Sequence, residues 1–247
     1  MATNPVQTFD KILGGAFTIV QPSAGQRFAV DSILLARFAR PRHGARVLEL
    51  GAGCGVVGVM IAALYRPRQV VAVELQPRLA AMIAENAAIN GIAAMTSACA
   101  DVRQRKIPGV APAAFDYVVS NPPYRMARSG RESPDAERRI ARGGGTTLND
   151  FIVASARYVR YGGRVALVFT AARTAELIAT LKEHSLEPKR IRFVHPMADK
   201  PAVMLMVEAR KGGGIETTIE PPLFLHARPG IYTAEARELL GRGDSQA

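Results

Sequence analysis

Short apolar runs alternate with longer segments of helical spacing through most of this 247-residue chain. The apolar runs predict strands at residues 46–50, 69–73, 95–100, 115–119 and 164–169. Helices are predicted between them, over a stretch ending near residue 64 and over residues 77–90, 148–158 and 174–184. Alternation of this kind is typical of a parallel sheet with helices on both faces.

The C-terminal part of the chain adds an antiparallel strand to the predicted sheet. Two further strands are predicted at residues 189–194 and 202–209, and the linker between them is too short for a parallel crossover. We therefore expect an α/β fold whose seven-stranded sheet is mostly parallel and ends in one antiparallel strand. A single domain should span residues 1–247, with residues 1–40 as an N-terminal cap or entry segment and residues 41–247 as its core.

The entry segment carries two local predictions. Residues 8–20 contain Gly14-Gly15 between alternating apolar positions and predict a small hairpin. Residues 26–38 predict a helix, with Asp31 or Ser32 as its N-cap. Asp31 has an alternative interpretation, as a carboxylate at the rim of a ligand pocket.

A glycine-rich turn follows the first core strand. Gly53, Gly55 and Gly58 form a G-x-G-x-x-G pattern between a strand and a helix, and Glu74 follows Gly53 by 21 residues, at the end of the second strand. Glycines let a backbone approach a ligand closely, and the acid can accept hydrogen bonds from ribose hydroxyls. An NAD-dependent oxidoreductase is therefore one candidate function.

Two more acids argue against a dinucleotide. Glu49 stands inside the first core strand, and Asp101 ends the third. Together with Glu74 they would repel a diphosphate and favour a ligand that combines a cationic amino acid with a nucleoside.

The sequence Ser120 to Tyr124 ends the fourth core strand abruptly. Pro122 and Pro123 cannot continue a sheet ladder, so the chain is held extended between the Asn121 carboxamide and the Tyr124 ring. Open α/β sheets place their chemistry at such strand ends. An amide oxygen, the Pro122 carbonyl and an aromatic face suit a flat amino group, such as that of a nucleobase.

Charge points to a polyanionic partner. The chain has a net charge of +11, and phosphate contacts dominate affinity for nucleic acids. A solvated basic surface is the alternative. Residues 125–145 are predicted to be a loop without an apolar period, rich in arginines: Arg125, Arg128, Arg131, Arg138, Arg139 and Arg142.

Other classes of protein are disfavoured. No apolar stretch approaches the ~20 residues of a membrane span, and residues 1–11 lack the apolar region of a signal peptide. The two cysteines and four histidines show no metal-ligand spacing. We expect a cytoplasmic protein without a metal; its oligomeric state is left open.

The acids, the glycines and Asn121-Pro122-Pro123-Tyr124, in this order, resemble the class I S-adenosylmethionine-dependent methyltransferases that modify exocyclic amino groups. Residues 26–38 and the C-terminal segment, with Pro221-Pro222-Leu223 and Tyr232-Thr233, resemble the bacterial tRNA (valine) adenine-N6 methyltransferase family. The resemblance covers nearly the whole chain. It implies a Rossmann-like fold, S-adenosylmethionine as cofactor, S-adenosylhomocysteine as product and tRNA as partner.

The resemblance also implies roles for individual residues. Catalysis would use Asn121, Pro122 and Tyr124, with Pro123, Tyr124, Arg125 and Arg128 on the substrate. Glu49 would face the amino group of the cofactor, Glu74 its ribose hydroxyls and Asp101 its adenine amino group. The full cofactor set would be Asp31, Glu49, Gly51, Gly53, Gly55, Glu74, Leu75, Asp101, Val102 and Asn121.

Several substrates remain open, because Asn-Pro-Pro-Tyr suits any planar amino group. The alternatives are guanine N2 of ribosomal RNA, adenine in DNA and the amide of a protein glutamine. A protein-glutamine enzyme normally carries a separate N-terminal helical domain, for which about 40 residues leave little room. A non-catalytic nucleotide-binding module that anchors RNA is the remaining class.

Overall fold

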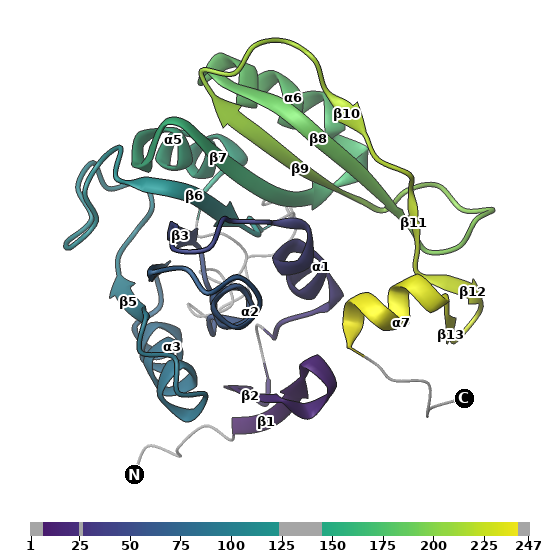
Figure 1. Cartoon of the computed structure of the whole chain (residues 1–247), viewed down its shortest axis with the longest axis horizontal. Coiled ribbons are helices and arrows are strands. Elements are labelled where there is room, and N and C mark those ends of the chain that lie inside the picture. The colour runs from purple at the N-terminus through teal and green to yellow at the C-terminus, as the bar shows by residue number, and fades with distance from the viewer. Residues whose placement is uncertain (1–6, 25–26, 124–144, 242–247) are drawn as a thin grey trace.

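A central nine-stranded sheet organises the molecule, with strand order β10-β8-β9-β7-β6-β3-β4-β5 and β11 paired to β8 (Figure 1). The computed structural model describes residues 7–24, 27–123 and 145–241. Its long strands are β3 (Arg46–Leu50), β4 (Gln69–Glu74), β5 (Met95–Cys99), β6 (Phe115–Ser120), β7 (Val159–Thr170), β8 (Leu186–His195) and β9 (Met204–Lys211). Strands β10 (Thr218–Ile219) and β11 (Leu223–Phe224) are short.

The directions of the strands confirm a mostly parallel sheet. Strands β3 to β7 pair parallel, whereas β9 is antiparallel to both β7 and β8. The sequence had led us to expect the antiparallel strand at the end of the sheet. The structure instead places it between two other strands. The expected count of seven strands was short by β10 and β11, which pair parallel with β8. Each is too short to give a periodic signal.

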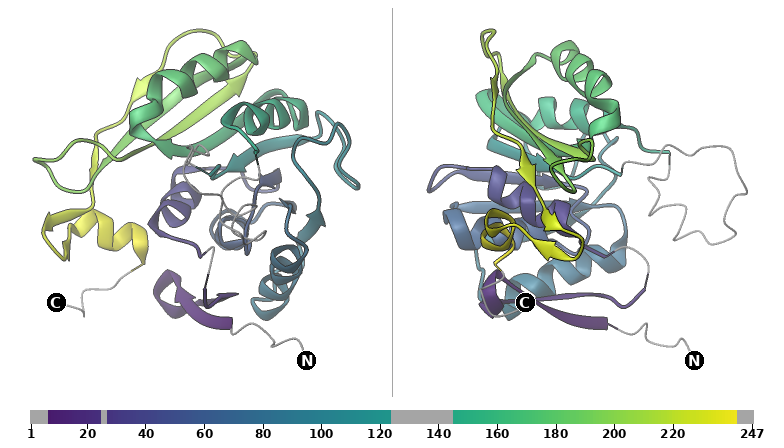
Figure 2. Two further views of the ribbon diagram at one scale, coloured as in Figure 1. Left: turned by 180° about the vertical axis from the view of Figure 1, so that it is seen from behind. Right: turned by 90° about the vertical axis from the view of Figure 1, so that its right-hand side faces the viewer.

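Two hydrophobic layers cover the sheet, one on each face (Figure 2). The first layer includes side chains of α1 (Val30–Phe38), α2 (Val56–Tyr65) and α3 (Pro77–Ile89). The second includes side chains of α5 (Leu148–Tyr158) and α6 (Thr174–Glu183). The predicted helices on both faces are confirmed. In the part of the chain that the structure describes, none of them is long and apolar enough to cross a membrane.

Strand β7 begins earlier than expected, at Val159. The sequence placed Gly162-Gly163 before the strand, whereas the structure places both glycines inside it, next to an irregularity in the β6–β7 register. A Cβ atom at Gly163 would come within 2.9 Å of the carbonyl oxygen of Asp116 on β6. The glycine therefore allows the two backbones to approach closely, which is a reason for glycine within a strand.

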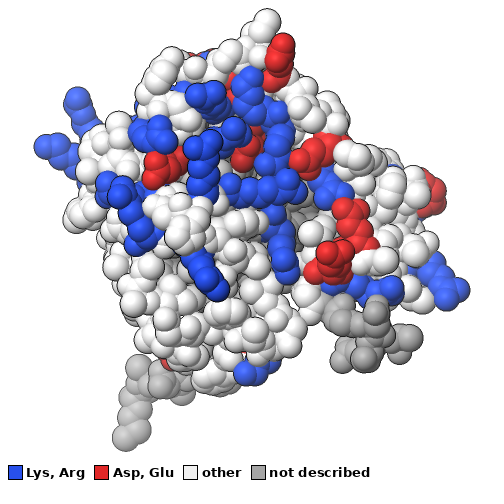
Figure 3. Space-filling view, viewed as in Figure 1, with Lys and Arg blue, Asp and Glu red and all other residues white. Residues whose placement is uncertain are grey.

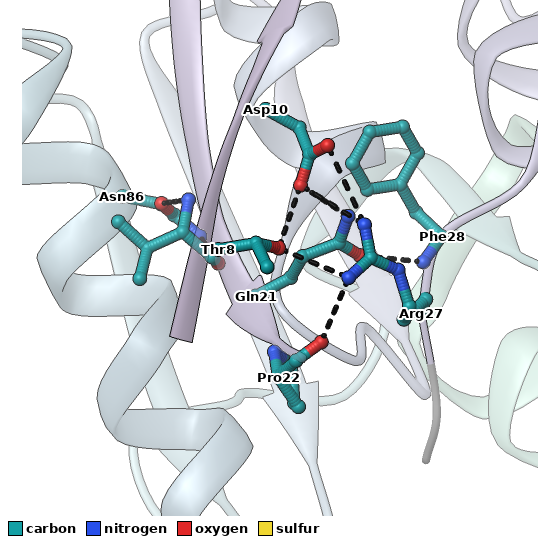
Figure 4. Close-up of polar contacts among 8 residues, drawn as sticks. Thr8, Asp10, Gln21, Pro22, Arg27, Phe28 and Asn86 are labelled. Carbon is teal, nitrogen blue, oxygen red and sulfur yellow. Dashed lines mark hydrogen bonds and ion pairs between the residues drawn. The ribbon is translucent and has the colours of Figure 1, made fainter. Parts of the chain in front are cut away.

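The N-terminal hairpin is confirmed, with strands β1 (Gln7–Ile12) and β2 (Phe17–Pro22) joined by the short turn η1 (Leu13–Gly15). Figure 4 shows the polar contacts that connect it to the following segment. Gln21 donates to Asp10 at 2.7 Å and accepts from the Phe28 amide at 3.0 Å. Arg27 pairs with Asp10 at 3.2 Å. These contacts fix the path of the chain into α1.

Helix α1 starts at Val30 after Ala29, so the expected N-cap at Asp31 or Ser32 is wrong. Both residues lie in the first turn of the helix. The Asp31 carboxylate accepts from the amide of Ser32 at 2.7 Å, and a negative charge there suits the positive end of the helix dipole.

The C-terminal segment returns across the first layer. After β11 the chain forms the two-stranded ribbon of β12 (His226–Arg228) and β13 (Ile231–Tyr232), and then α7 (Ala234–Leu240) (Figure 1). Ala236 and Leu240 of α7 are buried within this layer, and Thr233 caps the helix by accepting from the Ala236 amide at 3.1 Å. The end of the chain therefore contributes to the same core as α1.

Candidate active site

The register of three strands brings the predicted site together at one edge of the sheet. Leu50 of β3 pairs with Val73 of β4 and with Ser120 of β6. The residues that follow on the three strands therefore stand in one row, at the carboxyl ends where open α/β sheets bind ligands. These residues are Gly51, Glu74 and Asn121.

The glycine-rich turn needs its glycines. Gly51, Gly53 and Gly55 have φ angles of 69°, 57° and 84°, which side chains rarely adopt. A Cβ at Gly51 would lie 2.8 Å from the ring of Phe151. At Gly58 it would lie 2.6 Å from Met95 and 2.7 Å from a Glu49 oxygen. The backbone of the turn therefore packs closely against neighbouring side chains, with no room for a Cβ atom at Gly51 or Gly58. The turn leads directly into α2.

Glu74 holds this turn at the end of β4. One carboxylate oxygen accepts from the Gly53 amide at 2.9 Å, and the other accepts from the Gln76 amide at 2.9 Å. Burial raises the pKa of the carboxyl group, and these amide donors oppose the rise. Each carboxylate oxygen has a second lone pair, so Glu74 can still accept from a ligand hydroxyl.

Glu49 lies beneath the turn and is only 3% exposed. Its Oε2 accepts from the Gly58 amide at 2.9 Å, in the first turn of α2. Burial raises its pKa to about 8; the nearby charge of Glu74 adds to the rise, and the Gly58 amide opposes it. A carboxyl group poised near neutrality can respond to a cationic ligand by losing its proton.

Asp101 is engaged by a neighbour that the sequence analysis did not consider. Arg103 donates through its guanidinium group at 2.6 Å and through its backbone amide at 2.9 Å. The side-chain hydrogen bond from Arg103 holds the Asp101 pKa below its usual range. Val102 is buried beside it, and Leu75 is half-buried, with its carbonyl 3.7 Å from Cys99 Sγ. Asp101 is thus ionised and already forms a salt bridge with Arg103.

Asn121 is oriented from α1. Its Nδ2 donates to Ser32 Oγ at 3.2 Å, which ties the carboxamide to the first turn of the helix. The preceding residue, Ser120, is buried and donates through its hydroxyl to the Leu50 carbonyl at 2.8 Å. Pro122 is buried and Pro123 is half-buried. The strand end is therefore fixed on both sides of Asn121.

The remaining predicted site residues divide into two groups. Asp31 is half-buried on α1, one residue before Ser32 and therefore on the element that contacts Asn121. Tyr124, Arg125 and Arg128 lie outside the described residues. In the described part of the chain, no group of three His, Cys, Asp or Glu side chains could hold a metal ion.

Asn86 is a site residue that sequence reasoning missed. Fully buried on α3, it accepts from the Val20 amide at 2.7 Å and donates to the Val20 carbonyl at 2.9 Å. It also donates to the Cys54 carbonyl at 2.8 Å, and so joins the hairpin to the glycine-rich turn. The sequence did carry one indication of its role. Asn86 is a polar residue on the same helical face as the apolar residues Leu79 and Ile83.

Comparison with known proteins places this geometry in a family. The model of the methyltransferase small domain matches residues 24–187, which include the glycine-rich turn, all three acids and Asn121. The chain belongs to this family. It is an S-adenosylmethionine-dependent methyltransferase, and the Rossmann-like fold expected from the resemblance is confirmed.

Two curated relatives and one crystal structure show how far the similarity extends. The tRNA1(Val) (adenine(37)-N6)-methyltransferase of Aeromonas hydrophila is 28% identical over 88% of this chain and 89% of its own length. The enzyme of the same name from Parabacteroides distasonis is 28% identical over 83% of both chains. A predicted O-methyltransferase from Agrobacterium tumefaciens superposes with a TM-score of 0.68 at 25% identity, covering 86% of this chain and 97% of its own.

The residues of this methyltransferase fit its methyl donor. The turn offers a backbone surface at Gly51, Gly53 and Gly55, where left-handed φ angles exclude side chains. Beside it, Glu74 provides carboxylate lone pairs for hydroxyl groups, and Glu49 provides a carboxyl group whose raised pKa a cationic amino group would lower. Backbone approach, a hydroxyl acceptor and a site for a cation are what a sulfonium-linked amino acid and nucleoside require.

Proposed function

We propose that this methyltransferase transfers a methyl group to the N6 atom of an adenine in tRNA. The observation that carries the proposal is the fixed strand end at Asn121 and Pro122, held by Ser32 and placed in one row with the glycine-rich turn. The curated relatives named above, which match most of this chain, support adenine N6 and tRNA.

Within this proposal the cofactor lies along the carboxyl edge of the sheet. Glu49 would meet its amino group, and Glu74 its ribose hydroxyls through the lone pairs that the Gly53 and Gln76 amides leave. Asp101 would accept a hydrogen bond from the adenine amino group while it keeps its hydrogen bonds from Arg103. Leu75 would lie against the adenine ring with the Val102 backbone N–H nearby, and Asp31 would border the pocket from α1.

Two acceptors on β6 would position the target amino group. The Asn121 side-chain oxygen and the Pro122 carbonyl can each accept one of its N–H groups. An adenine N6 is a weak nucleophile because its lone pair is delocalised into the ring, and two acceptors favour a more pyramidal nitrogen. S-adenosylmethionine supplies an electrophilic methyl group. Catalysis then depends mainly on orientation, which can contribute up to ~7–11 kcal/mol.

The base must be unpaired or turned out of its helix to reach this strand end. Tyr124 would stack on it, a contact worth about 1–3 kcal/mol per base. Pro123 would border the base, and Arg125 and Arg128 would hold the adjoining phosphates.

The test is transfer of labelled methyl groups from S-adenosylmethionine into purified tRNA, followed by nucleoside analysis of the digested product. The expected label is in N6-methyladenosine from tRNA. Ribosomal RNA, DNA and protein are incubated in parallel, because label there as N2-methylguanosine, N6-methyldeoxyadenosine or methylglutamine would replace the proposed substrate. No label in any fraction, from protein that binds the cofactor, would contradict the proposal.

A further inference from the structure

A cluster of arginines lies at the amino end of the strands, on the edge of the sheet opposite the site. Arg46 begins β3, and Arg66 and Arg68 directly precede β4. The Arg66 carbonyl accepts from the Gly44 amide at 3.2 Å, and the Arg68 amide donates to the Ala45 carbonyl at 3.0 Å. The two connections into β3 and β4 therefore lie side by side. We call this the amino-edge surface: Arg40, Arg42, Arg46, Arg66 and Arg68.

Nearby acids neutralise this surface only in part. Asp116 accepts from the Arg46 backbone amide at 2.8 Å and interacts electrostatically with Arg68, but its ion pair is with an arginine outside the surface. Asp116 pairs with Arg160 at 2.7 Å, and the buried Glu208 pairs with Arg164 and Arg190. Within the residues that the structure describes, four exposed arginines of the surface make no ion pair: Arg40, Arg42, Arg66 and Arg68. Figure 3 shows Lys and Arg side chains gathered in the upper part of this face, with some Asp and Glu side chains among them, whereas the lower part is mostly uncharged.

Tyr65 shows that the fold concentrates positive charge here. Burial raises the pKa of its phenol, and the charges of Arg40, Arg37 and Arg190 oppose that rise. These three arginines come from α1, from the residues after it and from β8, so tertiary structure brings them to one phenol. Arg190 is itself paired with Glu208 and Glu220, whereas Arg40 makes no ion pair among the described residues. The unpaired guanidinium groups of the surface create a field that attracts anions.

Arg66 adds an independent observation. It caps the C-terminus of α2 in the left-handed conformation, with φ 48° and ψ 57°. Glycine is usual at such a cap, because a side chain there costs roughly 1–2 kcal/mol. The chain thus presents an exposed guanidinium group at a position where glycine would relieve strain.

Part of the surface is hollowed. An open cavity of about 520 Å³ is lined by Arg46, Arg68, Gln69, Ala93, Ala94 and Thr96. Arg46 is held in place there, since its Nε donates to Gln69 at 3.0 Å and its guanidinium group lies 5.1 Å from the centre of the Phe115 ring. A fixed guanidinium group beside an exposed one matches the geometry of phosphate oxygens.

We propose that the amino-edge surface binds the phosphate backbone of the RNA substrate, at a part of the RNA away from the target base. The five residues of β3 separate the two edges by roughly 17 Å, so one base and its own phosphates cannot occupy both. An RNA backbone fits better than a small anion, because the arginines come from separate segments and spread beyond the cavity. The proposal rests on RNA being the substrate.

The test compares two triple variants that remove the same charge. Arg42→Gln/Arg66→Gln/Arg68→Gln alters the surface. Lys11→Gln/Lys182→Gln/Lys200→Gln is the control, because these cations lie on β1, on α6 and in the β8–β9 turn. Affinity is measured for full-length tRNA and for a short stem-loop carrying only the target region, over a range of salt concentrations and without methyl donor.

The surface variant should bind tRNA roughly tenfold or more weakly, and its salt slope should fall by about 0.7–0.9 for each phosphate that the variant no longer neutralises. Its affinity for the short stem-loop should match that of the control. Equal tRNA affinity for the two variants, or an equal decrease on both RNAs, would overturn the proposal. So would unchanged tRNA affinity with weakened binding of poly-glutamate, which would indicate an acidic protein partner.

A single variant separates binding from folding. Arg66→Gly relieves the left-handed conformation, so its thermal unfolding midpoint should equal or exceed that of the wild type while its tRNA affinity falls. Unchanged tRNA affinity in this variant would count against the surface. Since binding is measured without turnover, the surface is tested even if the wild type methylates no RNA, in which case the proposed function fails separately.

Discussion

The two edges of one sheet carry opposite chemistry. At the carboxyl edge, Glu49 and Glu74 are buried against a glycine-rich turn and both have raised pKa values. At the amino edge, Arg42 and Arg68 are exposed, and the acid nearby is paired with another arginine. One edge is built to enclose a compact ligand with few, fixed contacts. The other presents charge over a broad area.

This difference separates two tasks that an RNA-modifying enzyme must perform. Chemistry at a single nitrogen requires orientation, which the carboxyl edge obtains by fixing Asn121 through Ser32 and the turn through Glu74. Holding a large polyanion requires charge more than precision. The comparison predicts that substitutions at the two edges change different measured quantities, and the following predictions run from the largest expected effect to the smallest.

The largest effect is expected at Asn121. Asn121→Ala removes an acceptor for the target amino group, and loss of one such positioning group typically lowers turnover by roughly 10²–10³-fold. Affinity for S-adenosylmethionine should change little, because the Glu74 clamp on the turn remains. Isothermal titration with the cofactor and methyl-transfer assays measure the two quantities. Lost cofactor affinity in a folded variant would contradict this role.

Two asparagines, Asn86 on α3 and Asn90 at the C-terminal cap of that helix, test which contact supports the glycine-rich turn at the carboxyl edge. Both amides bind the hairpin, but Asn86 also donates to the Cys54 carbonyl in the turn, whereas Asn90 contacts Thr18 and the Asn86 carbonyl. Asn86→Ala leaves several buried backbone groups unpaired, at roughly 1–3 kcal/mol each. We expect it to lower both the free energy of unfolding and cofactor affinity.

Asn90→Ala is the matched control, since its contacts are half-buried and do not reach the turn. Denaturant unfolding should show a smaller decrease in stability, with cofactor affinity retained. Equal decreases of cofactor affinity in both variants would mean that the hairpin, and not the Cys54 contact, supports the turn.

Taken over a single pH unit, the smallest effect is a dependence of stability on pH that comes from Glu49. Its folded pKa, about 8, lies above the ordinary value of 4.5. Between these values the unfolded chain has lost the proton that the folded protein keeps, so the stability of the ligand-free protein falls with rising pH, by up to about 1.4 kcal/mol per unit. Below the ordinary value the stabilisation is fully present.

Glu49→Gln should remove that dependence, because an amide oxygen can still accept from Gly58 without titrating. Thermal unfolding from pH 4 to pH 9 compares the two proteins. If Glu49 meets the cofactor's amino group, wild-type affinity should rise by up to about tenfold per unit toward pH 8, and the variant's should not. A flat wild-type profile would remove Glu49 from that role.

Most of the fold was predictable, because the core strands and helices carry strong periodic signals. The helices at residues 77–89 and 148–158 and the hairpin at residues 7–22 were predicted nearly to their boundaries. The C-terminal segment was not, since β10 and β11 contain two residues each and are defined only by pairing with β8. The position of β9 between β7 and β8 likewise depends on tertiary packing.

For the site, the sequence predicted which residues gather but not what holds them. Glu49, Glu74 and Asp101 end or interrupt apolar strands, which is visible in a single chain. The contacts of Ser32 with Asn121 and of Asn86 with Cys54 join residues 89 and 32 positions apart, respectively. No local pattern encodes such pairs. The amino-edge surface was missed for the same reason, because its arginines come from separate segments.

The most direct test of the division between the two edges is single-turnover methylation, with saturating S-adenosylmethionine and increasing concentrations of tRNA. The plateau rate reports the chemical step, and the half-saturating concentration reports RNA binding. Asn121→Ala should lower the plateau and leave half-saturation unchanged. Arg42→Gln/Arg66→Gln/Arg68→Gln should raise half-saturation and leave the plateau within about twofold of the wild type. If both variants change the same quantity, the two edges do not perform separate tasks.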